Sequence, residues 1–303
     1  MKIATYNTRN LYDANTFVGE DDENAVTEEM FQNRVSHFTE IFRPLDLDII
    51  CLQEIGGEKG VSMISETLGY ECYFAKPNKR GIRMAVMYKK SLAGHLHCSS
   101  VSFGELLIPS IQKVGDTSEL LPISQRRDVL VIDMDSYNGK KLRIVTFHLK
   151  SNLPMYLDDD NKETDAKAYT EAKFRCIFYK MMELRSLREY VDTSINEGRE
   201  VVLLGDYNEN YNSSTMDILR GSNQEERILT DVLYNYSKDK TTYIHRGNKL
   251  TFDTLLVSSK TNEALESVIV LNDNLQDFSL LPLETQVVES DHAMVVLTLK
   301  NTV

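Results

Sequence analysis

Eight polar residues that could bind a metal ion or transfer a proton lie beside short apolar runs, where strands are expected to begin or end. They are Asn7, Glu54, His148, Asp206, Asn208, Asp253, Asp291 and His292. Ligands and catalytic groups gather at such positions because the strands hold them in place. Carboxylates, carboxamides and imidazoles without thiolates suit a hard divalent ion, so this set predicts a site for Mg²⁺ or Mn²⁺ and a substrate phosphate.

Each of these residues has a simpler explanation when it is taken alone. A glutamate after a strand, such as Glu54, is usually a solvated strand end. Asp206 and Asn208 could form a turn, because both side chain types bond readily to nearby backbone. Ser290-Asp291-His292 could be a helix cap beside a surface histidine. The whole set in this order is harder to explain in that way, and we therefore expect a functional site.

Ten short apolar runs predict the strands that would position these residues, at 2–7, 48–53, 71–75, 83–89, 128–134, 142–148, 200–205, 252–258, 267–271 and 293–299. The run at 200–205 does not alternate with polar residues, which is typical of a strand covered on both faces. With few helices between them, these strands predict an α+β fold in which two sheets pack face to face with helices outside. We expect a single domain that spans residues 1–303.

Two longer helices are predicted. The first begins after an N-cap at Thr27 and ends before Pro44. The second covers approximately 165–197, and its apolar stripe is predicted to lie in the core: Phe174, Ile177, Phe178, Met181, Leu184 and Val191. Residues 104–125 and 152–164 show no sustained periodicity and are predicted to be loops.

The composition, with 42% hydrophobic and 26% charged residues, excludes a disordered, collagen-like or coiled-coil chain. The formal net charge of −12 excludes a protein that coats DNA passively, since such binding depends on cations that neutralise phosphates. A metal-dependent nuclease is compatible with this charge, because a bound metal ion can reverse the local field.

The four cysteines form no C-x-x-C pair, and Cys51 lies in an apolar run typical of a buried thiol. No window is long and apolar enough to cross a bilayer, and the first residues lead into strand-like alternation rather than a signal sequence. We therefore expect a cytoplasmic protein that does not bind membranes. We also expect a monomer without an obligate protein partner.

Three motifs resemble one known superfamily: Leu52-Gln53-Glu54, Gly205-Asp206-Tyr207-Asn208 and Ser290-Asp291-His292. They make the chain similar to the endonuclease/exonuclease/phosphatase superfamily, which has the fold of pancreatic-type deoxyribonuclease, exonuclease III and the inositol-phosphate phosphatases. The resemblance implies a four-layer αββα sandwich with two mixed sheets. It also implies Mg²⁺-dependent hydrolysis of a phosphoester.

The resemblance implies that Glu54 is the principal metal ligand, with Asn7 beside it and Asp291 as a further candidate. A metal ion at this place would lower the barrier, because negative charge collects on the phosphate oxygens and the leaving alkoxide in the transition state. The expected cofactor is Mg²⁺ or Mn²⁺.

The resemblance assigns the catalytic steps to a second group of residues. Asp206 and Asn208 would orient the attacking water and the phosphate, while His148 and His292 would flank the scissile group. The residue before His292 would point to the opposite face of a strand and is poorly placed to pair with it. Asp253 is the better partner, because it would hold the ring in the tautomer whose free nitrogen accepts a proton from water.

Two cations, Arg127 and Lys150, are candidate ligands of the substrate phosphate, although either could be an ordinary solvated side chain. Looser similarity to bacterial nucleases of the superfamily is found at 80–88, 127–130, 148–151 and 243–247. No Tyr-x-Pro-Asn motif follows His148, which counts against specificity for abasic sites.

These features predict a divalent-metal-dependent phosphoesterase with nucleic acid as its substrate. It would hydrolyse phosphodiester bonds of DNA, with RNA as a further candidate, through a water activated at Asp206 and His292. The alternative is a small-molecule phosphatase or phosphodiesterase that acts on an inositol phosphate, a lipid headgroup or a nucleotide. The acidic balance favours the small substrate, and the nuclease-like segments favour nucleic acid. A binding module without catalysis is disfavoured because the polar set is complete.

Overall fold

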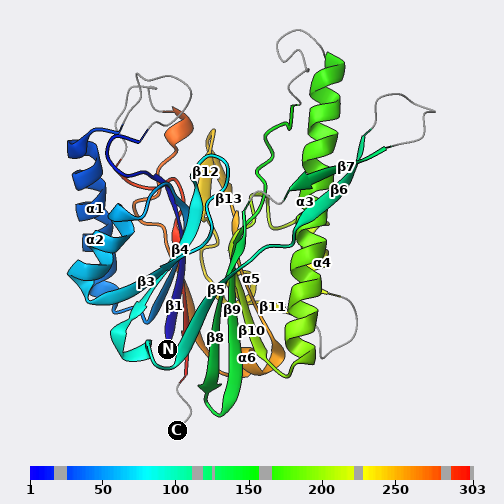
Figure 1. Ribbon diagram of the computed structural model, residues 1–303. Coiled ribbons are helices and arrows are strands. Elements are labelled where there is room, and N and C mark those ends of the chain that lie inside the picture. Colours follow the sequence, from blue (N-terminus) through cyan, green and yellow to red (C-terminus); the bar gives the residue numbers. More distant parts are fainter. Residues whose placement is uncertain are drawn as a thin grey trace.

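The structure is a computed structural model that describes residues 1–16, 26–110, 119–124, 127–156, 166–221, 228–280 and 288–300. Figure 1 shows two β-sheets packed face to face, with helices α1 and α2 covering one sheet and the long helix α3 covering the other. This arrangement confirms the predicted four-layer αββα sandwich.

The first sheet is mixed, because β1 runs parallel to β2 and antiparallel to β16. Its strands lie in the order β15-β16-β1-β2-β4-β3. In that order they span Leu265–Leu271, Met294–Leu299, Lys2–Leu11, Ile49–Ile55, Arg83–Lys89 and Tyr70–Phe74.

The second sheet is also mixed, because β10 runs parallel to β9 and antiparallel to β14. Its strands lie in the order β11-β14-β10-β9-β8-β5. In that order they span Thr230–Asp231, Asp253–Val257, Glu200–Asp206, Lys140–His148, Val129–Tyr137 and Leu96–Val101.

The helices and the remaining strands surround these sheets. The α-helices α1 to α6 span Glu28–Phe42, Lys59–Leu68, Ala166–Asn196, Met216–Arg220, Val232–Tyr236 and Ser259–Glu263. The 3₁₀ turns η2, η3 and η5 span Arg43–Leu45, Lys90–Leu92 and Phe278–Leu280. Two hairpins complete the described elements, β6–β7 (Glu105–Ser110 and Glu119–Ser124) and β12–β13 (Tyr243–His245 and Asn248–Leu250).

The apolar core has three layers that follow from this arrangement. Between the sheets, Cys51 and Val86 of the first sheet belong to the same buried cluster as Ile144 and Leu204 of the second. A second cluster joins the first sheet to α1 and α2, and a third joins the second sheet to α3 and α4. Full burial of such a side chain stabilises the folded state by about 1.5–3 kcal/mol. The cluster between the sheets therefore holds them at a fixed separation.

All ten predicted strands are present, but the prediction of a loop over 104–125 is wrong for residues 105–110 and 119–124, while residues 111–118 and 125 lie outside the described part of the chain. Residues 105–110 and 119–124 pair as the antiparallel hairpin β6–β7, which contacts α3. Pro109 and Pro122 interrupt the alternation of the sequence there, and prolines are tolerated on edge strands. For the second predicted loop, residues 157–164 lie outside the described part of the chain.

The prediction that the α3 stripe is core is correct only for the C-terminal half of the helix. Leu184 and Val191 are buried, whereas three other members are 41%, 56% and 42% exposed: Phe174, Ile177 and Met181. The N-terminal half covers the segment that follows β9, and the side chains it buries there include Arg175 and Lys180. Backbone carbonyls of that segment need donors, so charged residues take the place of apolar ones.

Among the helices that the structure describes, none combines the length and the apolar composition that crossing a membrane requires.

Candidate functional site

The predicted site residues meet at one end of the sandwich, the upper end in Figure 1. Within the first sheet, Asn7 lies beside Gln53 in the pairing of β1 with β2. Within the second sheet, Asp206 lies between His148 on β9 and Asp253 on β14. The sheets face each other, so these strand ends place Asn7, Glu54, His148, Asp206, Asn208, Asp253 and His292 in one cluster.

The buried carboxylate of Asp206 is the centre of this cluster. Its Oδ2 accepts hydrogen bonds from Nδ2 of Asn7 and from Nδ2 of Asn208, both at 2.9 Å. Its Oδ1 accepts a bond from the backbone N–H of Asn208 at 2.7 Å. The bond from Asn7 crosses from one sheet to the other, so the position of Asp206 depends on both sheets.

Gly205 allows β10 to approach β9 closely just before this carboxylate. Its φ of +146° lies in a region that residues with a side chain rarely adopt, and a Cβ at this position would lie 2.0 Å from the carbonyl oxygen of Phe147. Only glycine fits here, which explains the glycine of the Gly205-Asp206 motif.

His292 is hydrogen-bonded to Asp253, the partner expected from the sequence. Its Nδ1 lies 2.8 Å from Oδ2 of Asp253, and its Nε2 lies 3.8 Å from Oδ2 of Asp206. Burial alone would lower the pKa of His292, but attraction to Asp253 and then to Asp206 outweighs burial and raises that pKa to about 10. The ring therefore carries a positive charge at neutral pH, next to the Asp206 carboxylate.

The second histidine, His148, is buried and neutral. Its Nε2 lies 3.4 Å from Oδ2 of Asp206 and 3.6 Å from Oε1 of Glu54, while its Nδ1 has no hydrogen-bond partner among the described residues. Burial lowers the pKa of His148 well below its usual value, and the positive charges of Arg127 and His292 lower it further. The sequence identified no carboxylate that would orient this ring, and the described residues contain none at Nδ1.

Burial also governs the protonation of Asp206. It raises the pKa of this carboxyl to about 7, although the nearby charge of His292 acts in the opposite direction. Repulsion from the carboxylates of Asp253 and Glu54 contributes to the rise. A carboxyl group with a pKa near neutrality can gain and lose a proton under ordinary conditions.

Glu54 is held in an unusual backbone conformation with one carboxylate oxygen fixed. Its φ is +61°, in the left-handed region that non-glycine residues rarely adopt. Its Oε2 accepts a bond from the backbone N–H of Asn10 at 3.1 Å, and the side chain is 21% exposed. Oε1, in contrast, faces His148 and Asp206.

The donor atoms of this cluster fit a hard divalent cation. Ligand atoms of Glu54, His148 and Asp206 lie within 4.8 Å of one another, and those of Asp206, Asp253 and His292 form a second such group. Oxygen donors prevail in both groups, and no thiolate takes part in either. A set of this kind favours Mg²⁺ or Mn²⁺ over metals that prefer sulfur.

Three predicted residues have other contacts. Asp291 lies 3.7 Å from Nε of Arg9 and belongs to neither group of clustered ligand atoms. The buried ammonium of Lys150 donates to the carbonyls of Ser151 and Leu153, both at 2.7 Å. Arg127 lies beside the site, where its Nη1 donates to the carbonyl of His148 at 3.3 Å.

Gln53 has a structural role that the sequence did not reveal. Its Nε2 donates to Oγ1 of Thr5 at 3.1 Å and to Oγ1 of Thr146 at 3.0 Å, so a buried amide joins the two sheets directly beneath the site. The sequence identified Gln53 only as part of a motif, and nothing in the motif indicates which hydroxyls it reaches.

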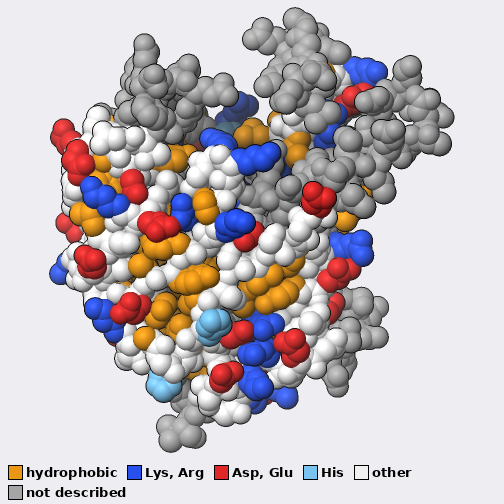
Figure 2. Space-filling model, viewed as in Figure 1, with side chains coloured by type: hydrophobic (Ala, Val, Ile, Leu, Met, Phe, Trp, Pro, Cys, Tyr) orange, Lys and Arg blue, Asp and Glu red, His pale blue; other side chains and the backbone are white. Residues whose placement is uncertain are grey.

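Aromatic and cationic side chains line one side of the site. The ring of Tyr243 lies 4.9 Å from that of His292, and it stacks with the rings of Phe252 at 4.7 Å and His245 at 6.1 Å. Next to the β12–β13 hairpin, the guanidinium of Arg9 lies over the ring of Phe278. The sequence identified the segment 243–247 only by its looser similarity to bacterial nucleases, and that similarity does not predict the stacking of its rings. Figure 2 shows Lys and Arg side chains near this same upper end of the molecule.

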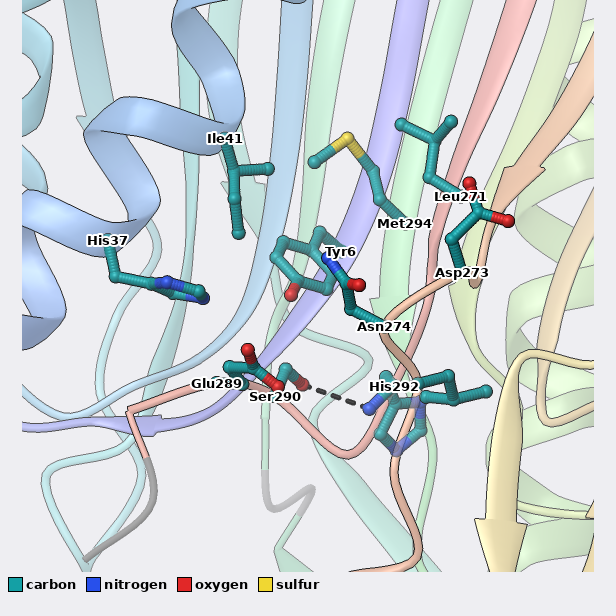
Figure 3. Close-up of a pocket in the computed structure, with 11 residues that line it drawn as sticks. Tyr6, His37, Ile41, Leu271, Asp273, Asn274, Glu289, Ser290, His292 and Met294 are labelled. Carbon is teal, nitrogen blue, oxygen red and sulfur yellow. Dashed lines mark hydrogen bonds between the residues drawn. The ribbon is translucent and has the colours of Figure 1, made fainter.

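A cavity of about 180 Å³ lies behind the segment that carries His292. Figure 3 shows Tyr6 at its centre, with His37 of α1 on one side and Asn274 on the other. The hydroxyl of Ser290 accepts a bond from the backbone N–H of His292 at 3.0 Å, and the His292 ring points away from Tyr6. This cavity therefore lies beside the backbone segment that holds His292, and the His292 ring is directed away from it.

Comparisons with known proteins concern the family and the fold of this chain. The model of the Endonuclease/Exonuclease/phosphatase family matches residues 4–258. No curated protein has a sequence that matches this chain.

Solved structures with the same fold cover nearly the whole chain. A 3′ phosphatase from Neisseria, bound to a product DNA hairpin, is 16% identical with a TM-score of 0.57, over 99% of each chain. A humanised TDP2 from D. rerio is 15% identical with a TM-score of 0.58, over 99% of this chain and 98% of the other. A mannosyl-6-phosphatase from Bacteroides thetaiotaomicron is 16% identical with a TM-score of 0.53, over 99% of each chain.

Proposed function

The chain belongs to the endonuclease/exonuclease/phosphatase family of phosphoester hydrolases, and on that basis we propose that it is a divalent-metal-dependent nuclease that cleaves DNA. One observation carries the proposal. The buried Asp206 carboxylate is held by two amides, lies beside two imidazoles, and shares a ligand cluster with Glu54. Hydrolysis of a phosphoester requires groups of this kind, which bind a metal ion and stabilise the charge that develops on the phosphate.

Glu54 would hold the metal ion, with the side chain of Asn7 next to it. When bound, Mg²⁺ or Mn²⁺ supplies a positive charge that stabilises the phosphate oxygens in the transition state. Asp291 would act at the rim through its contact with Arg9 rather than as a ligand.

Asp206 is the base that we propose for the attacking water. Burial raises the pKa of this carboxyl above its usual range, which favours uptake of a proton from water, and the amides of Asn7 and Asn208 hold the carboxyl group in place. His292 would contribute its positive charge, since its Nδ1 is bonded to Asp253 and its Nε2 points into the cluster. This division differs from the expectation that His292 itself takes the proton from water.

The aromatic and cationic side of the site supports a polynucleotide substrate. Bases stack on aromatic rings such as those of Tyr243 and His245, and Arg9 is suited to a neighbouring phosphate. Arg127, beside His148, would contact the scissile phosphate. Lys150 is committed to backbone carbonyls and would hold the segment after β9 rather than the substrate.

A small-molecule phosphatase is the second candidate. The net charge of −12 favours it, and the structures with the same fold include a mannosyl-6-phosphatase as well as a phosphatase bound to DNA.

A panel of substrates tests the proposal, assayed with Mg²⁺ or Mn²⁺ and with EDTA as the control. It contains supercoiled plasmid, single-stranded DNA, RNA, an inositol phosphate, mannose 6-phosphate and bis-p-nitrophenyl phosphate. We expect metal-dependent cleavage of DNA that Asp206→Asn abolishes. Metal-dependent turnover of only the monoesters would favour the phosphatase, and full turnover in excess EDTA would contradict both.

A further inference from the structure

The β1 strand contains an irregular segment just after Asn7. Asn7 pairs with Gln53 on β2, but the next pair is Leu11 with Ile55, so β1 has two more residues than β2 over this stretch. The extra length places Arg9 and Asn10 at φ of +50° and +56°, in the left-handed region. Residues other than glycine adopt this conformation at a cost of about 1–3 kcal/mol each, so surrounding contacts must hold them there.

Arg34, on the buried side of helix α1, provides those contacts. Its Nη1 donates to the carbonyls of Arg9 at 3.1 Å and Asn10 at 2.9 Å, and its Nη2 donates to the carbonyl of Thr8. One guanidinium therefore binds three successive carbonyls of the irregular segment. Burial lowers the pKa of Arg34 to about 10, so the side chain remains charged at neutral pH.

The backbone N–H groups of the same segment point to the proposed metal ligands. The N–H of Asn10 donates to Oε2 of Glu54 at 3.1 Å, and the N–H of Arg9 donates to Oδ1 of Asn7 at 2.9 Å. Because the carbonyls on one side of the segment bind Arg34, the N–H groups on the other side are held toward Glu54 and Asn7.

We propose that Arg34 is a positioning residue that fixes the metal-binding geometry of Glu54 and Asn7 through the backbone of residues 8–10. It touches neither ligand side chain through a hydrogen bond of its own, and it acts from outside the sheet. The inference rests on the proposed function only in treating Glu54 and Asn7 as metal ligands.

The direction in which metal affinity changes after loss of Arg34 distinguishes a geometric role of this residue from an electrostatic one. The guanidinium is positive, so by charge alone its removal would strengthen the binding of a cation. Loss of the geometry acts in the opposite sense, because removal of groups that orient metal ligands weakens affinity by about 10–100-fold. Weaker binding after loss of Arg34 therefore reports the geometry and not the charge.

The experiment measures Mn²⁺ affinity from the electron paramagnetic resonance signal of the free ion, which does not depend on activity. The variants are Arg34→Met, which has no donors, and Arg34→Lys, which keeps the charge but cannot reach three carbonyls. Arg188→Met is the control, because Arg188 is another helix cation that donates to a backbone carbonyl, that of Leu219 at 2.8 Å, and it pairs with Asp192 outside the site. Thermal unfolding in EDTA verifies that each variant is folded.

We expect Arg34→Met to weaken Mn²⁺ binding by about tenfold or more, Arg34→Lys by less, and Arg188→Met by no measurable amount. Methylguanidinium should restore part of the affinity in Arg34→Ala, and urea at the same concentration should not. If Arg34→Met does not fold, a decrease in Arg34→Lys alone carries the test.

Unchanged or stronger Mn²⁺ binding in the Arg34 variants would overturn the inference, as would an equal loss in Arg188→Met. Failure of the wild-type protein to bind any divalent ion is a different result, because it would overturn the proposed function and the inference together.

Discussion

Replacing Asp253 by asparagine removes the negative charge beside His292 while keeping the size of the side chain. Asp253 is fully buried, and its Oδ2 accepts the Nδ1–H of the ring at 2.8 Å. The carbonyl oxygen of an asparagine could still accept that bond, so the variant tests the charge more than the contact. The Nε2 of His292 would still lie 3.8 Å from Oδ2 of Asp206.

The size of the effect follows from the pKa of His292. Burial opposes the charged ring, yet Asp253 and Asp206 together raise its pKa from 6.5 to about 10. At about 1.4 kcal/mol per pKa unit, this rise is worth roughly 5 kcal/mol of folding free energy, and Asp253 has the larger share, about 3 kcal/mol. Since the pKa is higher in the folded protein, this stability is fully present below pH 6.5 and is lost as the pH rises through about 10.

Urea unfolding in EDTA, at several pH values between 6.5 and 10, measures this directly. Asp253→Asn should lower the free energy of unfolding by about 3 kcal/mol at the acid end and by progressively less toward the alkaline end. In a His292→Gln background the same substitution should show no such pH dependence. A loss that is constant with pH, or that grows toward pH 10, would refute the reasoning.

Three further predictions concern the metal, the close approach of two strands and the core. Glu54→Gln should weaken Mn²⁺ binding by about tenfold or more while the melting temperature in EDTA stays near that of the wild type; equal affinity would remove Glu54 from the ligand set. Gly205→Ala should unfold at a much lower temperature in a thermal melt, because its Cβ would lie 2.0 Å from the carbonyl oxygen of Phe147, and a stable variant would contradict the strand approach. Ile64→Ala should lose about 2–5 kcal/mol in urea unfolding but keep the turnover number of its folded fraction, and a selective loss of turnover would show that α2 acts on the site through its core face.

The positions of the strands along the chain were predictable because the core dictates them. A strand between two covered layers must be apolar along its length, and 200–205 shows that pattern directly. The pairing of His292 with Asp253 was also predicted, but the reasoning from alternation along a strand does not apply, because Asp291 and His292 lie before β16 begins at Met294. Asp291 does point elsewhere, to Arg9.

Buried polar residues on helices were not predictable in the same way. Arg34 and Lys180 occupy helix positions where the sequence alone suggests solvated cations, yet both donate to backbone carbonyls next to the site. Their partners come from irregular segments after strands, and the demand of those carbonyls for donors is invisible in a pattern of apolar residues. For the same reason, the apolar stripe of α3 was assigned to the core although half of it is exposed.

The site depends on the packing of two sheets, neither of which contains a complete set of groups. The first sheet contributes Asn7 and Glu54, and the second contributes His148 and Asp206. The distances among them are therefore set by the core between the sheets, where Gln53 spans the gap to a hydroxyl of the second sheet. Helices α1 and α3 then fix the strand ends from outside through buried cations.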